Sequence, residues 1–239
     1  MARKPRQNKA SRPRSRSATK PAVAKQAVRR VRAEADSPYH HGALRDALLQ
    51  AAEKVLERDG LPGLTLRAVA REAGVSHAAP THHFGDLTGL LSELAAIGYR
   101  RFGAAMDAAD NTAMPKERGL ASAKAYVAYA LAHPGLYGLM FRAERLDMTR
   151  PSLREAADAS FAGFAEAIGA NRGEQISAES LTLEQAGALA AAWSLVHGFS
   201  TLLLDGRLTK IFRGLPEGTK PETLLVAMLK STLSRPPVH

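Results

Sequence analysis

Cysteine is absent from the 239 residues of the sequence. Disulfide bonds, a cysteine nucleophile and zinc bound by cysteine are therefore excluded. The absence fits a reducing compartment, although secreted proteins can also lack cysteine. We expect a cytoplasmic protein.

Long hydrophobic runs and sustained strand-like alternation are also missing. No uninterrupted apolar stretch approaches the roughly 18 residues that a membrane span requires. The most apolar segment, residues 185–204, is interrupted by Ser194, His197 and Gly198, which predicts a buried core helix rather than a membrane span. We therefore expect an all-α fold with no membrane contact.

Positive charge is in excess, but only at the amino end. The sequence has 33 Lys and Arg against 23 Asp and Glu, a formal net charge of +10. Residues 1–36 contain twelve of the basic residues and two of the acidic ones, which leaves 21 of each sign in residues 37–239. Because residues 1–36 lack aromatic side chains, we expect a disordered basic tail. This tail either follows DNA phosphates or is a solubilising segment, a transit peptide or a misassigned start.

The rest of the chain has the periodicity of helices. A stripe of apolar residues predicts a first helix, which Gly60 ends, and its members are Leu44, Leu48, Ala51, Ala52, Val55 and Leu56. Asp86 is placed to cap a second long helix that runs to about Met106.

Further punctuation predicts the remaining helices. A polar break at residues 110–115 precedes a helix over about 116–132, and a short apolar segment follows at 136–141. Capping boxes predict three more helix starts, at Ser152 with Glu155, Thr182 with Gln185 and Thr219 with Glu222.

The segment from residue 64 to residue 91 is the most informative part of the chain. Thr65 is placed to cap a helix over residues 66–73, Gly74 permits the left-handed backbone that ends it, and Ser76 can cap the next helix. The first of these helices has an apolar face made of Leu66, Val69, Ala70 and Ala73. Two short helices joined by a glycine turn predict a helix-turn-helix, whose second helix enters the DNA major groove.

Three regions follow from these patterns. Residues 1–36 are the basic tail, and residues 37–87 are expected to form a three-helix DNA-binding domain with the helix-turn-helix. Residues 88–234 are expected to form a larger helical domain.

The sequence resembles the TetR family of bacterial transcriptional repressors. The closer likeness covers residues 41–91, at Thr65, Leu66, Ala70, Ala73, Gly74, Val75, Ser76, His83, Phe84, Leu90 and Leu91. The strings SHAAP at 76–80 and WSLVHG at 193–198 resemble the subgroup with a tryptophan-histidine-glycine motif. The resemblance implies a homodimer that leaves a palindromic operator in double-stranded DNA when an unknown small-molecule effector binds. It also implies that residues 88–234 are the domain for effector binding and dimerisation. It implies no catalysis and no cofactor.

Two positions depart from the family pattern. Thr81 stands where the family usually has an aromatic residue that touches the phosphate backbone, and Leu87 stands where it often has lysine. Residues 37–87 are also slightly acidic, with five Lys and Arg against six Asp and Glu. Because phosphate neutralisation supplies much of DNA affinity, we expect the basic tail to compensate.

The expected DNA contacts lie on the helix-turn-helix. His77, Ala78 and Thr81 can reach base edges, and the caps Thr65 and Ser76 can anchor phosphates at helix amino ends. The complete set is Thr65, Arg67, Ser76, His77, Ala78, Thr81, His82 and His83. Phe84 is expected in the core rather than on DNA.

Five histidines raise the alternative of a metal site. They lie at positions 40, 41, 77, 82 and 83, but their spacing does not place two ligands on one helix face. We expect solvated or DNA-facing imidazoles and no metal. Their protonation at mildly acidic pH would strengthen DNA binding, which is a hypothesis.

Aromatic residues in the larger region are candidates for an effector pocket. Trp193 and His197 share one helix face, with His197 as the polar anchor. The expected ligand contacts are Tyr126, Tyr129, Tyr137, Met140, Phe141, Phe164, Trp193 and His197. Ordinary core packing is the alternative for each of them.

Small and apolar residues on the last two long helices suit a dimer interface. They are Gly187, Ala190, Ala191, Leu224, Leu225, Met228 and Leu229. Packing within one chain would produce the same pattern. An architectural protein dominated by its basic tail is the alternative function, and no acid, base or nucleophile arrangement favours an enzyme.

Overall fold

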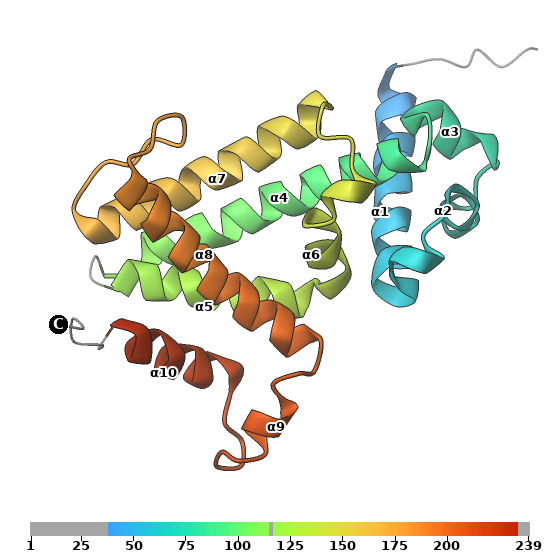
Figure 1. Ribbon diagram of the computed structural model, residues 1–239. Coiled ribbons are helices and arrows are strands. Elements are labelled where there is room, and N and C mark those ends of the chain that lie inside the picture. The colour runs from blue at the N-terminus through green and yellow to red at the C-terminus, as the bar shows by residue number, and fades with distance from the viewer. Residues whose placement is uncertain (1–37, 115–116, 234–239) are drawn as a thin grey trace, which may run out of the picture. The chain divides into compact units, whose positions relative to one another are not determined.

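The computed structural model describes residues 38–114 and 117–233, and the side chains of residues 42–114 and 117–232. Its helices, in chain order, are α1 (Pro38–Gly63), α2 (Leu66–Ala73), α3 (Ala78–Phe84), α4 (Leu87–Thr112), α5 (Arg118–Ala132), α6 (Pro134–Met140), α7 (Pro151–Arg172), α8 (Leu183–Leu204), α9 (Thr209–Phe212) and α10 (Pro221–Leu233), with a 3₁₀ turn η2 (Ala143–Arg145) between α6 and α7 (Figure 1).

The expected all-α fold is confirmed. Within the described ranges, the only β feature is an isolated bridge between Ser177 and Ser180. The predicted basic tail, residues 1–36, lies outside the described residues.

The first helix and the glycine turn of the helix-turn-helix form as the local signals predict. The Thr65 hydroxyl accepts a hydrogen bond from the Ala68 amide (3.1 Å) and caps α2. Gly74 has φ 68° and ψ 30°, the left-handed conformation that glycine adopts without a steric cost. The amide of Val75 then donates to the Ala70 carbonyl (3.0 Å), so the chain turns sharply from α2 towards α3.

The predicted cap at Ser76 is wrong. Helix α3 begins at Ala78, and the residue at its N-cap is His77, whose side chain makes no capping hydrogen bond. Ser76 contributes its backbone carbonyl, which accepts from the Ala79 amide (3.1 Å). The chain before α3 is therefore held by a backbone hydrogen bond and not by the Ser76 hydroxyl.

The predicted stop in α1 and the predicted start of α4 are both confirmed. Helical geometry in α1 is interrupted at Gly60, with φ 69° and ψ 179°. The Asp86 carboxylate accepts from the Gly89 amide (2.8 Å) and caps α4. Helix α4 continues to Thr112, so the predicted end near Met106 is too early. Polar residues on a solvent-facing helix surface do not end a helix, and the Thr112 hydroxyl bonds back to the Ala108 carbonyl (2.9 Å).

One of the three predicted capping boxes is confirmed. The Thr182 hydroxyl accepts from the Gln185 amide (3.2 Å), and the Gln185 side chain accepts from the Thr182 amide (3.1 Å). The other two capping boxes do not form, although α7 and α10 begin within two residues of the predicted starts, at Pro151 and Pro221. Ser152 lies inside α7 and donates to Glu93 (2.8 Å), and Thr219 donates to the Pro216 carbonyl (2.6 Å) before α10 begins at Pro221.

Two large hydrophobic clusters hold the described helices together. The first joins the helix-turn-helix to α4, α6 and α7, because Val55 and Phe84 share it with Leu94, Leu136 and Leu153. The second lies among α4, α5, α6, α8 and α10, with Phe102, Val127, Phe199 and Leu225 among its members. The helix-turn-helix therefore rests on the same core as the first turns of α4 and α7.

Helix α8 differs from the buried core helix predicted for residues 185–204. Only one face is buried, with Leu189, Val196, Phe199 and Ser200, while Leu183 and Trp193 are 84% and 43% exposed. Among the helices of the described ranges, α8 alone is long and apolar enough to cross a membrane by length and composition. Its exposed side is a large apolar surface that one chain leaves without a partner.

Candidate functional site

The exposed surface of α2, the turn and α3 carries most of the expected DNA contacts. Thr65, Arg67, Ser76, His77, Ala78, Thr81 and His82 are all exposed. His83 is half-buried, and its ring lies 5.5 Å from that of His82 and 6.2 Å from that of Phe84. Phe84 is 2% exposed, which confirms its expected place in the core.

Acidic neighbours engage one of the basic side chains near this surface, that of Arg58. Arg58 forms ion pairs with Asp59 (2.9 Å) and Glu72 (2.9 Å). Hydrogen bonds to Asp59 and Glu72 raise the pKa of the Arg58 guanidinium, and the bond from Arg58 lowers the pKa of Asp59. In the described part of α2, Arg67 and Arg71 make no ion pair within 4 Å. Both of these arginines are exposed.

The described residues contain no group of three or more His, Cys, Asp or Glu arranged to hold a metal ion. The side chains of His40 and His41 lie outside that part of the structure, so three of the five histidines can be placed. Of these, His77 and His82 are exposed, as DNA-facing or solvated imidazoles would be.

A cavity of about 1050 Å³ lies among α4, α5, α7, α8 and α10. Its walls are mainly apolar, and their aromatic members are Tyr99, Phe102, Tyr126, Phe141, Phe161, Phe164 and Trp193. This volume is at the upper end of what small-molecule sites in proteins occupy. The described chain thus has room for an organic molecule of considerable size.

Four of the eight residues expected to contact a ligand line this cavity: Tyr126, Phe141, Phe164 and Trp193. The other four, Tyr129, Tyr137, Met140 and His197, are not among its lining residues. Tyr129, Tyr137 and Met140 are at most 6% exposed and pack in the second hydrophobic cluster.

Sequence reasoning missed part of the cavity wall. Phe102 and Met106 of α4 and Ser122 of α5 line it, and Ser122 donates a hydrogen bond to Asp110. The apolar face of α4 was visible in the sequence as a continuation of the helix capped by Asp86. Its orientation towards α7 depends on the tertiary packing, which no local signal carries.

Charged side chains around the cavity balance in sign. The acidic ones are Asp107, Asp110 and Asp158, and the basic ones are Arg100, Arg172 and Lys230. A cavity with this balance and an aromatic wall favours an apolar molecule without a strong net charge over an ion.

A polar cluster lies directly behind the aromatic wall. His197 Nδ1 lies 2.9 Å from the Tyr126 hydroxyl and 2.8 Å from the Tyr137 hydroxyl, and the Tyr137 hydroxyl also donates to that of Tyr126 (3.4 Å). Burial lowers the pKa of His197 and raises the pKa values of both tyrosines. The cluster is therefore uncharged near neutral pH, with the imidazole able to accept from a tyrosine hydroxyl.

The His197 ring connects this cluster to the cavity lining. Its centroid lies 4.5 Å from that of Phe141 and 6.2 Å from that of Trp193, and both of these residues line the cavity. A molecule that displaces Phe141 or Trp193 would thus press on His197.

The residues expected at a dimer interface divide into two groups. Gly187, Ala190 and Ala191 of α8 are exposed in the single chain, and Gly187 has open space around it. Leu225 of α10 is fully buried within the chain, while Leu224, Met228 and Leu229 are half-buried against the second cluster. The α8 group is therefore available to a partner, and Leu225 is occupied by packing within the chain.

Two protein-family models match the chain. The model described as bacterial regulatory proteins of the tetR family matches residues 48–94, which include the helix-turn-helix. The model described as the tetracyclin repressor-like C-terminal domain matches residues 120–229, which include most of the cavity wall. Among curated proteins, none matches the chain.

Solved structures share the fold over most of its length. A protein of unknown function from Rhodococcus sp. RHA1 is 36% identical, with a TM-score of 0.62 over 82% of this chain and 96% of that one. A tetR-family regulatory protein from Rhodococcus RHA1 is 20% identical, with a TM-score of 0.54 over 80% and 95% of the two chains. The regulator PfmR from Thermus thermophilus is also 20% identical, with a TM-score of 0.52 over 75% and 93%.

The two family models together cover the helix-turn-helix and most of the residues that line the cavity. The chain belongs to the TetR family of DNA-binding transcriptional regulators, which are not enzymes.

Proposed function

We propose that this regulator is a cytoplasmic, dimeric repressor that a small apolar molecule releases from a palindromic operator. The observation that carries the proposal is the cavity of about 1050 Å³ beside α4, whose first turns lie in the same core as the helix-turn-helix. A ligand that moves α4 would move the recognition helix α3 with it, because packed cores shift as units.

The chemistry of the cavity supports an apolar, aromatic or aliphatic effector without net charge. Six of its lining residues are charged, three of each sign, whereas seven are aromatic. We also propose that the chain belongs to the subgroup with the tryptophan-histidine-glycine motif, which the string WSLVHG at 193–198 supports.

The exposed apolar side of α8 supports the homodimer. Leu183 and Leu202 are 84% and 42% exposed, and small residues at Gly187, Ala190 and Ala191 would let a second α8 approach closely. Two copies related by two-fold symmetry would present two α3 helices to a DNA site with the same symmetry.

Selection of bound DNA from a random pool tests this function. The full chain is expected to enrich a palindrome, and a chain of residues 37–239 is expected to enrich the same palindrome with lower affinity. If neither enriches any symmetric site and removal of residues 1–36 abolishes binding, the protein is an architectural DNA-binding protein and the proposal fails.

A further inference from the structure

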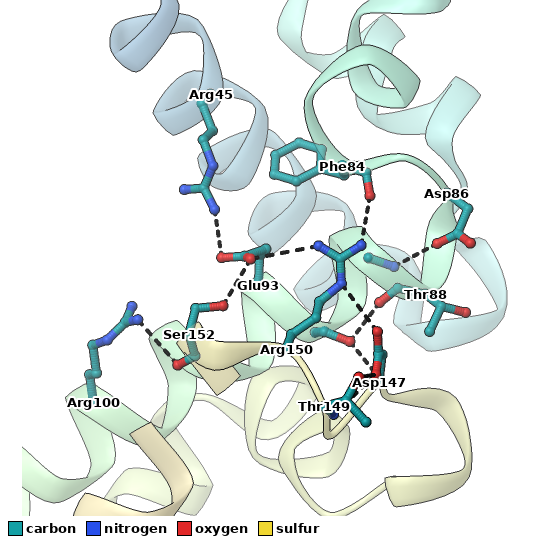
Figure 2. A network of polar contacts seen from close by, with 12 residues as sticks. Arg45, Phe84, Asp86, Thr88, Glu93, Arg100, Asp147, Thr149, Arg150 and Ser152 are labelled. Carbon is teal, nitrogen blue, oxygen red and sulfur yellow. Dashed lines mark hydrogen bonds and ion pairs between the residues drawn. The ribbon is translucent and has the colours of Figure 1, made fainter. Parts of the chain in front are cut away.

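Arg150 joins the end of the recognition helix to the beginning of α7. Its guanidinium Nη2 donates a hydrogen bond to the carbonyl oxygen of Phe84 (3.1 Å), the last residue of α3. Arg150 itself is the N-cap residue of α7, so the two helices meet through one side chain (Figure 2).

Glu93 of α4 holds the same arginine from the other side. Its carboxylate lies 3.9 Å from Arg150 Nη1 and accepts hydrogen bonds from Arg45 of α1 (2.5 Å) and Ser152 of α7 (2.8 Å). The Glu93 side chain is only 14% exposed, which makes this arrangement less screened by solvent than an ordinary surface pair.

The segment before α7 is fixed to the first turns of α4. Asp147 lies 3.6 Å from Arg150 Nε, and its amide donates to the hydroxyl of the buried Ser92 (2.9 Å). The Ser92 hydroxyl in turn donates to the Thr88 carbonyl (2.7 Å). Arg150 therefore starts from an anchored backbone, so little conformational freedom is lost when its side chain reaches Phe84.

Gly89 shows independently that this contact requires a close approach. A Cβ atom at position 89 would lie 2.1 Å from the Phe84 carbonyl oxygen and 2.5 Å from Arg150 Nη2. Any side chain there would displace the end of α3, the guanidinium or both. The first turn of α4 thus leaves space for this hydrogen bond only because residue 89 is glycine.

We propose that Arg150 positions the recognition helix, by fixing the carboxyl end of α3 to the amino end of α7. The planar guanidinium suits the role because its separate N–H groups face the Phe84 carbonyl and the Glu93 carboxylate at once, which a lysine ammonium on a flexible stem does not reproduce. Helix α7 continues from Arg150 into the cavity wall, where Ala157, Phe161 and Phe164 are found. Helix α7 would thus be a second connection, in addition to α4, between the cavity and the DNA-binding surface. This part of the proposal rests on the proposed function.

Hydrogen–deuterium exchange of the free, full-length protein tests the positioning role without DNA. Arg150→Gln and Gly89→Ala are expected to speed exchange at the last turn of α3, where the Gly85 amide donates to the Thr81 carbonyl (2.8 Å), about fivefold or more. Arg150→Lys, which retains the charge, is expected to do the same. Arg154→Gln is the matched control, because Arg154 is an exposed arginine on the same helix.

Circular dichroism establishes that each variant is folded before exchange is compared. Equal exchange at the end of α3 in Arg150→Gln, Arg150→Lys and Arg154→Gln would overturn the proposal. If Arg150→Gln does not fold, the more conservative Arg150→Lys decides it in the same way.

DNA binding supplies the second readout. With the duplex that the wild-type chain selects from a random pool, Arg150→Gln is expected to weaken binding about tenfold, whereas Arg154→Gln changes it less than about twofold. The duplex should also slow exchange at the start of α7 in the wild type and not in Arg150→Gln. Equal losses in the two variants would contradict the proposal. If the wild type selects no duplex, the proposed function fails, whereas exchange in the free protein still decides the role of Arg150.

Discussion

At the scale of single residues, burial and contacts show which of two neighbouring residues can face a ligand, whereas the residue types alone do not. Trp193 and His197 share a helix face, yet Trp193 lines the cavity and His197 contacts two tyrosine hydroxyls behind it. The sequence predicted the pair but could not say which member faces a ligand. That distinction depends on α5 and α6, which bring Tyr126 and Tyr137 to the His197 ring.

His197 makes folding stability depend on pH. Burial lowers its pKa in the folded protein, so the unfolded state binds more protons in mildly acid solution, and stability falls as pH decreases below the ordinary histidine pKa of about 6.5. The variant His197→Asn keeps an acceptor near the position of Nδ1 but does not titrate. Between about pH 8 and about pH 5.5, its melting temperature is expected to fall less than that of the wild type. Thermal melts by circular dichroism measure both, and parallel curves would contradict the assignment.

The contacts around Arg150 could not be predicted from the sequence. Its neighbourhood suggested a helix start through Ser152 and Glu155, whereas Ser152 donates to Glu93, which lies 59 positions earlier in the chain. A capping-box pattern cannot reveal that a distant carboxylate competes for the hydroxyl. The contact from Arg150 to Phe84, across 66 positions, was likewise beyond any local signal.

At the scale of elements, the helix-turn-helix was predictable because its signals are local. Thr65, Gly74 and Asp86 act within three or four residues of their own positions, as caps and a turn. The extent of α4 and the caps of α7 and α10 were predicted less well, because packing against neighbouring helices decides them.

The hydroxyls of Thr65 and Ser76 are expected to contribute differently to the free energy of unfolding. Thr65→Ala should lower the free energy of unfolding by about 1 kcal/mol, because the Ala68 amide loses its acceptor. Ser76→Ala should change it by less than about 0.5 kcal/mol, since the cap of α3 is not formed by that hydroxyl. Urea denaturation of the two variants compares them directly, and equal losses would restore Ser76 as a cap.

At the scale of the whole molecule, the single chain leaves an apolar side of α8 exposed and a large cavity beside it. Composition and periodicity predicted apolar helices, but they could not divide the apolar residues among core, cavity and partner surface. Leu225 is fully buried within the chain, whereas Ala190 and Ala191, expected at the same interface, are exposed.

A charge on the exposed side of α8 tests the dimer. Ala191→Glu would place two carboxylates in a symmetric apolar contact, and we expect the dimer dissociation constant to rise at least about tenfold. Ala108→Glu is the control, because Ala108 is an exposed alanine on α4. Light scattering across a dilution series gives the masses. Unchanged dimerisation in Ala191→Glu would place the interface elsewhere.

Filling the cavity tests most directly the claim that it controls DNA binding. Because the chain has no cysteine, Ala157→Cys puts a single thiol at the cavity wall and Ala108→Cys puts one on the exposed side of α4. Each variant is labelled with pyrene maleimide, and its affinity for the duplex selected by the wild type is measured before and after labelling. We expect labelling at position 157 to weaken binding at least about tenfold and labelling at position 108 to leave it unchanged. Equal affinity of labelled and unlabelled Ala157→Cys would contradict control of the operator by the cavity.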